Sequence, residues 1–76
     1  MKESVIRTAF DNIVSHISNM DEIRTLVEKL ESENLSTSAI IDYLQREIED
    51  AEVTLRTDIR ILINECRHVE SGKKGK

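Results

Sequence analysis

Two residues near the C-terminal end of the chain have the spacing of a metal-binding pair. Glu65 and His68 lie three positions apart, so on a helix they share a face, as the Glu and His ligands of carboxylate-bridged di-metal bundles do. Such a site also needs inward-facing carboxylates from other helices, and the apolar stripe of the first segment contains no acidic residue. We therefore expect no metal or other cofactor, and we interpret His68 as an exposed residue near a helix end.

Cys66 is a second candidate for chemistry, as a nucleophile. A reactive thiolate needs a base within hydrogen-bond reach and a lowered pKa. His68 is two positions away and therefore on another helix face, and His16 has no evident partner. We interpret Cys66 as a small core residue in a reducing, cytoplasmic compartment, and we expect that the protein is not an enzyme. The enzyme alternative needs a site built across two subunits from His16, Glu65 and His68.

Basic residues in the last third of the chain are the third candidate. Residues 1–52 contain five basic and twelve acidic residues, whereas residues 53–76 contain six basic and three acidic ones. The six are three arginines on one side of a helix and three lysines of the tail: Arg56, Arg60, Arg67, Lys73, Lys74 and Lys76. They are possible contacts for phosphates or an acidic partner. The alternative is a solvated face whose cations suit the C-terminal end of the helix dipole.

Apolar side chains recur every three or four residues along the chain, which indicates helices. One broad apolar face covers about residues 3 to 18, and a second stripe over residues 20 to 30 is rotated from it by about a quarter turn. Asn19 and Glu22 have the spacing of a capping box, so a helix break near Asn19 would realign the two stripes. A single curved helix over about residues 3 to 33 is the alternative, and the sequence leaves both open.

The periodicity stops between Glu33 and Ser38, which predicts a hairpin turn. With Ser36 as the N-cap of the next helix, Leu35 and Ile40 have the spacing of a hydrophobic staple. Beyond the turn, one stripe continues from Ile40 to Val69 with gaps of three or four only.

This last stripe predicts a single uninterrupted helix over about residues 37 to 70, roughly 50 Å long at 1.5 Å per residue. That length is too great for a compact monomer of this size. The apolar surface widens at four positions, which we assign to a partner or dimer surface: Val53, Ile59, Ile61 and Ile63. Asp58 lies beside the stripe, and we expect it to pair with an arginine of a neighbouring helix or to be hydrated.

Size and composition set the architecture. A 76-residue chain forms one domain, and a domain of this size buries only about 60% of the surface of its unfolded chain. One cysteine allows no internal disulfide, so association of two subunits is the expected source of further stability. We predict an all-α antiparallel helical hairpin of two or three helices with a long C-terminal helix, dimerising into a helical bundle. Residues 1–70 form the domain and residues 71–76 a flexible basic tail.

The function predicted from these features is that of a small regulatory or adaptor protein. It acts as a non-enzymatic homodimer that contacts another protein through its helix faces. The alternative is a nucleic-acid-binding helical bundle that uses the basic face, although the stacking aromatics typical of such sites are not near the arginines. No apolar run approaches the ~20 residues of a membrane span, and no secretion signal begins the chain, so we expect no membrane contact.

Overall fold

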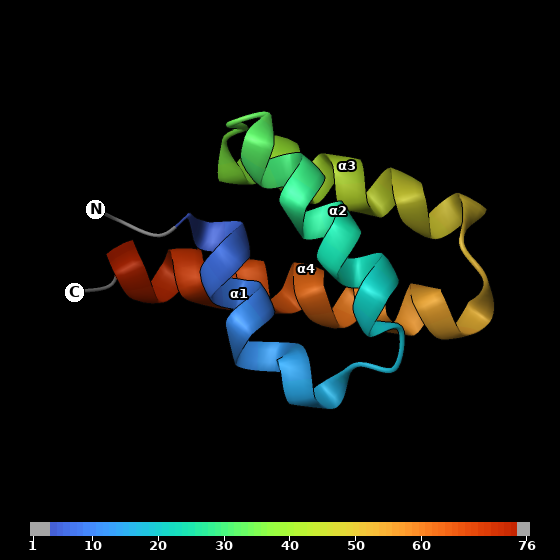
Figure 1. Cartoon of the computed structure of the whole chain (residues 1–76). Helices are drawn as coiled ribbons and strands as arrows, with labels where there is room; N and C mark the ends of the chain where they lie inside the picture. The colour runs from blue at the N-terminus through green and yellow to red at the C-terminus, as the bar shows by residue number, and fades with distance from the viewer. Residues whose placement is uncertain (1–3, 75–76) are drawn as a thin grey trace.

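The computed structural model describes residues 4–74, which fold into four α-helices arranged in two layers. The helices are α1 (Val5–Ile13), α2 (Met20–Ser32), α3 (Thr37–Asp50) and α4 (Val53–Lys74), with a 3-10 turn at Val14–His16 after α1. Figure 1 shows α3 and α4 side by side and antiparallel, with α1 and α2 crossing in front of them. The all-α prediction is confirmed for the described residues, none of which is in a strand.

Serine side chains cap two of the helices. The backbone nitrogen of Arg7 donates to Ser4 Oγ at 3.1 Å at the start of α1, and that of Ala39 donates to Ser36 Oγ at 3.2 Å at the start of α3. Leu35 packs against the core cluster that contains Ile40, as the predicted staple requires. The predicted turn and the predicted start of the following helix are therefore confirmed.

The first segment is two helices rather than one curved helix. After the 3-10 turn the backbone at Ile17 is extended, with φ −109° and ψ 150°, and α2 begins at Met20. The break lies where the rotation of the stripes indicated it. The predicted capping box is wrong, because the Asn19 side chain makes no cap hydrogen bond to α2. Its amide nitrogen donates instead to Asp58 Oδ2 on α4, at 2.9 Å.

The prediction of one uninterrupted helix over residues 37 to 70 is also wrong. Helix α3 ends at Asp50, Ala51 is extended with φ −88° and ψ 155°, and α4 begins at Val53. The carbonyl oxygen of Ala51 accepts a hydrogen bond of 2.9 Å from Arg56 Nε. This bond replaces the backbone hydrogen bond that the same carbonyl would accept in a continuous helix. Because the chain reverses here, the two halves of the stripe face the same core instead of lying along one exposed rod.

This reversal completes the core within one chain. Buried apolar side chains from all four α-helices form one cluster: Ile6, Ala9, Phe10, Ile13, Ile23, Val27, Leu30, Ile40, Leu44, Ile59, Leu62, Ile63 and Cys66. Among the residues that the structure describes, Val53 is the exposed large apolar side chain. Helix α4 ends at Lys74, inside the segment 71–76 predicted as a tail, and residues 75 and 76 lie outside the described residues.

Within residues 4–74, no helix combines the length and the apolar character needed to cross a lipid bilayer.

Candidate functional site

The acidic residues of α4 point toward the other helices. Asp58 is 3% exposed, and its Oδ2 atom accepts hydrogen bonds from Ser18 N at 3.0 Å, Asn19 N at 2.7 Å and Asn19 Nδ2 at 2.9 Å. A buried carboxylate is tolerated when donors of this kind replace its water. Asp58 therefore pairs with neither an arginine nor bulk water, contrary to our expectation. It anchors the connection between α1 and α2.

The other two acids of α4 are half-buried and hydrogen-bonded. Glu65 Oε2 accepts from Asn12 Nδ2 of α1 at 2.9 Å, and Glu70 Oε1 accepts from Thr37 Oγ1 of α3 at 3.1 Å. All three acids of α4 are thus used in contacts within the domain. The exposed side chains described on this helix include no carboxylate.

The arginines of α4 lie on its solvent side. Arg56, Arg60 and Arg67 are exposed, and at ~100° per residue their directions fall within about 40° of one another. Arg56 is held at the Ala51 carbonyl, whereas Arg60 and Arg67 make no hydrogen bond or ion pair with any residue between 4 and 74. All three arginines are therefore exposed on one helix, and their contact with a phosphate or an acidic partner stays a prediction. Of the tail lysines, Lys73 and Lys74 have side chains that are not described, and Lys76 lies outside the described residues.

The unpaired arginines border a groove between α3 and α4, which we call the α3–α4 groove. Its volume is about 200 Å³, and its lining residues are Gln45, Ile48, Arg60, Ile63, Asn64 and Arg67. Ile63 is buried and Ile48 is half-buried, so the floor is apolar while amides and guanidinium groups form the rim. Guanidinium groups bind carboxylates through two parallel hydrogen bonds, and the amides can donate or accept. The groove is thus suited to an anion that also carries an apolar group.

The four residues predicted as a partner or dimer surface are not exposed together. Ile59 is 1% exposed and Ile63 is 4% exposed, while Ile61 is half-buried against the core. Only Val53, 73% exposed, is free of such packing. The reason is the reversal at Ala51, since α1 and α3 pack against α4 and cover the side chains that a straight rod would have left exposed.

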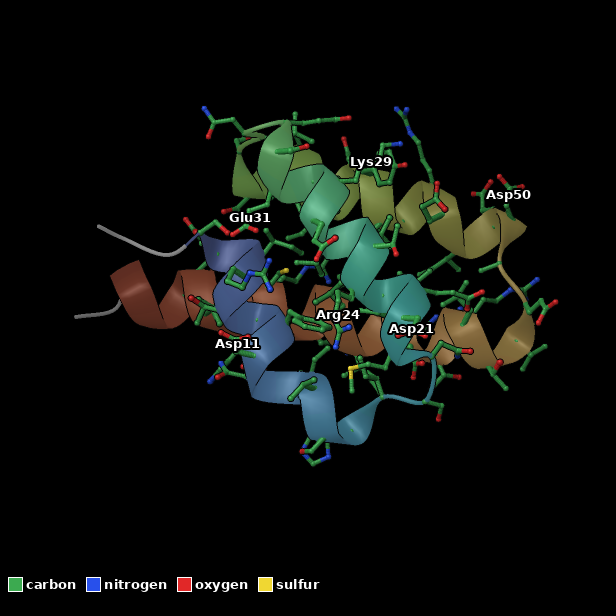
Figure 2. All side chains as sticks on the ribbon, in the orientation of Figure 1. Asp11, Asp21, Arg24, Lys29, Glu31 and Asp50 are labelled. Atoms are coloured by element: carbon green, nitrogen blue, oxygen red, sulfur yellow. The ribbon has the colours of Figure 1, made fainter. Side chains whose placement is uncertain are left out.

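Acidic side chains dominate the exposed surface of α2 and α3, in contrast to α4. They are Asp21, Glu22, Glu28, Asp42, Glu49 and Asp50, together with Glu33 after α2. Figure 2 shows Asp50 projecting outward at the end of α3 and Asp21 at the start of α2. The surface of a chain of formal net charge −4 is therefore divided into an acidic part and a cationic face on α4.

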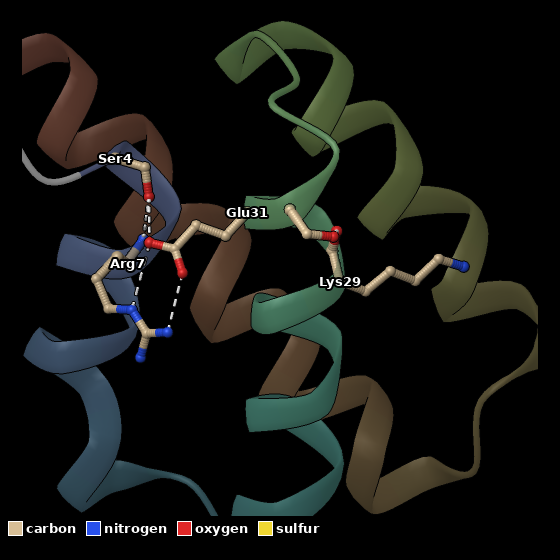
Figure 3. A network of polar contacts seen from close by, with 5 residues as sticks. Ser4, Arg7, Lys29 and Glu31 are labelled. Atoms are coloured by element: carbon tan, nitrogen blue, oxygen red, sulfur yellow. Dashed lines mark hydrogen bonds and ion pairs between the residues drawn. The ribbon is translucent and has the colours of Figure 1, made fainter.

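A polar network joins the start of α1 to the end of α2 (Figure 3). Arg7 Nη2 lies 2.9 Å from Glu31 Oε1, and Ser4 Oγ donates to Glu31 Oε2 at 3.1 Å. The hydrogen bond from Arg7 holds the pKa of the Glu31 carboxyl below its ordinary value, and the bond from Ser4 acts in the same direction. The pairing was not predicted, because the two residues lie on different helices and no sequence pattern relates them. Its role is to hold two helices together.

The residues considered for catalysis are not brought together. Cys66 is fully buried, and burial raises the pKa of its thiol to about 12, so the thiolate does not form near neutral pH. Cys66 is thus a core residue, as predicted. His16 and His68 are exposed. The described residues contain no group of three or more His, Cys, Asp or Glu side chains placed to hold a metal ion.

Similarity to known proteins adds nothing to this description, because no protein-family model, no curated protein and no solved structure matches the chain.

Proposed function

We propose that this domain is a small non-enzymatic binding protein that acts through protein–protein contact, with the α3–α4 groove as its binding surface. The observation that carries the proposal is a pair of arginines, Arg60 and Arg67, that have no partner among the described residues and lie beside the apolar floor of Ile48 and Ile63. A protein segment offers both carboxylates for the guanidinium groups and apolar side chains for the floor.

The charge distribution favours a protein partner over nucleic acid. A formal net charge of −4 produces a field that repels a polyanion at long range, whereas a partner with a few carboxylates interacts mainly at the groove. A phosphate backbone also has no apolar group to place against Ile48. The second candidate, nucleic-acid binding, is supported by the exposed face of α4, which carries three arginines and no acid among its described side chains.

The partner that we propose is another protein rather than a second copy of this chain. The predicted homodimer was meant to cover an apolar stripe, and that stripe is now accounted for by the core of one chain. Two copies would have to associate through polar surface, and Val53 alone is too small an apolar contact for a stable dimer.

Site-directed photo-crosslinking tests this proposal. An Asn64→Cys variant, labelled with a maleimide benzophenone, places the probe at the groove, while the buried Cys66 reacts poorly. A Glu28→Cys variant places the same probe on the exposed side of α2. In extract from cells that produce the chain, we expect protease-sensitive adducts from the groove probe only.

A charge reversal makes the result specific. Combining Asn64→Cys with Arg60→Glu and Arg67→Glu should remove the adducts, because the arginines are the proposed anion contacts. Adducts that are destroyed by nuclease would support the nucleic-acid candidate instead. Adducts that persist after charge reversal, or none at all, would overturn the assignment of the groove.

A further inference from the structure

We infer that the occupant of the α3–α4 groove is a helical segment of the partner, with two carboxylates seven residues apart and an apolar side chain midway between them. This inference rests on the proposed function, and it specifies the partner's chemistry and register. Its first basis is the geometry of α4. Arg60 and Arg67 are separated by seven residues, so the rise between them is about 10.5 Å and their directions differ by about 20°.

A helix packed along α4 matches this arrangement. Carboxylates at positions i and i+7 of the partner have the same rise and the same near-alignment as the two arginines. An extended strand does not match, because about 10 Å corresponds to three residues of a strand, and side chains three apart point to opposite faces. A strand therefore cannot present both carboxylates to the groove at the required distance.

The floor of the groove specifies the residue between the carboxylates. Ile63 lies three positions after Arg60 and four before Arg67, and Ile48 of α3 faces the same groove. A side chain at i+3 or i+4 of a partner helix lies over this apolar floor. We expect an aliphatic residue there, because a polar group would lose water over Ile48 and Ile63 without gaining a hydrogen bond.

Among residues 4–74, the exposed carboxylates that lie seven positions apart do not carry this pattern. Asp21 and Glu28 are seven apart on α2, but the residues midway are Arg24 and Thr25. Asp42 and Glu49 are seven apart on α3, but the residues midway are Gln45 and Arg46. Both pairs enclose an arginine, which would lie over the apolar floor between Arg60 and Arg67 and would be repelled by them. A second copy is therefore a poor occupant of the groove, and a different protein is the better one.

Peptide binding by the purified chain tests the inference. The probe is an end-capped, fluorescein-labelled 18-residue helical peptide on an Ala/Gln background, with Glu at two positions seven apart and Leu midway. Two control peptides carry Gln in place of both Glu residues, or the same Glu residues five apart, which places them on different faces. Fluorescence anisotropy is expected to show saturable binding that is weaker by about tenfold or more for each control.

Charge exchange supplies the matched variants. The double variant Arg60→Glu with Arg67→Glu should no longer bind the Glu peptide. It should instead bind a peptide that carries Lys at the same two positions. Arg24→Glu with Arg46→Glu changes the net charge equally, on exposed positions of α2 and α3, and should alter affinity less than about threefold. Circular dichroism confirms folding, since exposed substitutions rarely change stability by more than about 0.5 kcal/mol.

The other possible outcomes distinguish failure of the inferred pattern from failure of the proposed function. Equal binding of the probe and the five-apart control would overturn the helical register. No binding of the probe, combined with arginine-dependent protein adducts at position 64, would overturn the inferred pattern but leave the proposed function intact. Binding of a 30-base-pair duplex DNA with a steep salt dependence, and no peptide binding, would overturn both.

Discussion

Asn19 and Asp58 are joined by two hydrogen bonds although 39 positions separate them, one of 2.7 Å from the Asn19 backbone nitrogen and one of 2.9 Å from its side-chain amide. Both end on the same carboxylate oxygen, which also accepts from Ser18 N. This contact ties the non-helical connection between α1 and α2 to α4. It therefore fixes how α1 and α2 cross over α4, the helix that carries Arg60 and Arg67.

Asp58→Ala is expected to be the most destabilising polar substitution. It leaves the part-buried backbone donors of Ser18 and Asn19 without their acceptor, and the loss of such an acceptor costs about 1–3 kcal/mol for each group that water does not reach. Urea denaturation at pH 7 should show a loss of about 3 kcal/mol, and Asp58→Asn, which keeps an acceptor oxygen, should lose less. A change below about 0.5 kcal/mol for Asp58→Ala would show that the contact does not stabilise the fold.

Glu31 makes stability depend on pH in the acidic range. Because Arg7 holds the folded-state pKa of Glu31 below its ordinary value, the carboxylate contributes stability that is present above about pH 4.3. That contribution is lost as the pH falls through the lowered pKa. The two side chains are about one-third exposed (29% and 33%), so solvent screening limits the effect to about 1 kcal/mol or less.

Carboxyl NMR titration measures the Glu31 pKa directly. In the native chain it should lie below the ordinary value, and in Arg7→Gln it should return toward that value. Urea denaturation should show a correspondingly smaller difference in stability between pH 7 and pH 3 for Arg7→Gln. A Glu31 that titrates at its ordinary pKa in both chains would contradict the contact drawn in Figure 3.

Ser36→Ala should destabilise the domain by about 1 kcal/mol, because it removes the side-chain acceptor for the Ala39 backbone nitrogen at the start of α3. Ser38→Ala is the matched control, since Ser38 is exposed in the first turn of α3 and makes no cap. In thermal unfolding, the midpoint temperature of Ser36→Ala should be clearly lower than that of Ser38→Ala. Equal midpoints would show that the cap contributes no stability.

The reversal of the chain at Ala51 brings the start of α3 close to the end of α4. In the structure Thr37 Oγ1 donates to Glu70 Oε1 at 3.1 Å, so the beginning of α3 lies against the end of α4. A continuous helix would separate positions 38 and 71 by about 50 Å at 1.5 Å per residue. Spin labels on Ser38→Cys and Ser71→Cys should report a distance well under half of that length. A value near 50 Å would show that residues 37 to 70 form one continuous helix. In that case α3 and α4 would not lie side by side and would not form the groove.

The sequence was sufficient for the helical character of the chain and for the Ser36 cap, but not for the hydrogen bonds of Asn19 or for the reversal. Ala51 favours a helix, the chain has no proline, and the intervals of three and four continue through the break. An amphipathic stripe indicates which side of a helix faces apolar surroundings. It does not indicate whether those surroundings belong to another subunit or to a helix of the same chain that folds back. The excess length of the predicted rod for a 76-residue chain was the one available signal.

The candidate site was predictable only in part, for the same reason. A helical wheel groups Arg56, Arg60 and Arg67, because they belong to one helix. It cannot bring Gln45 and Ile48 of α3 next to them, since that proximity depends on the turn. Asp58 was conspicuous as a carboxylate beside an apolar stripe, but its partners lie in the connection between α1 and α2 and follow from the tertiary fold.

The most direct test of the central claim observes the groove while it is occupied. The signals to follow in the ¹⁵N-labelled chain are those of the side-chain amides of Gln45 and Asn64 and of the Nε–H groups of Arg60 and Arg67, which line the groove. Titration with the helical peptide that carries Glu, Leu and Glu is predicted to shift these signals together, in a saturable way, while those of Arg24 and Arg46 stay in place. Shifts of equal size at all four arginines, or none at the groove, would contradict the claim that the α3–α4 groove binds an acidic helix.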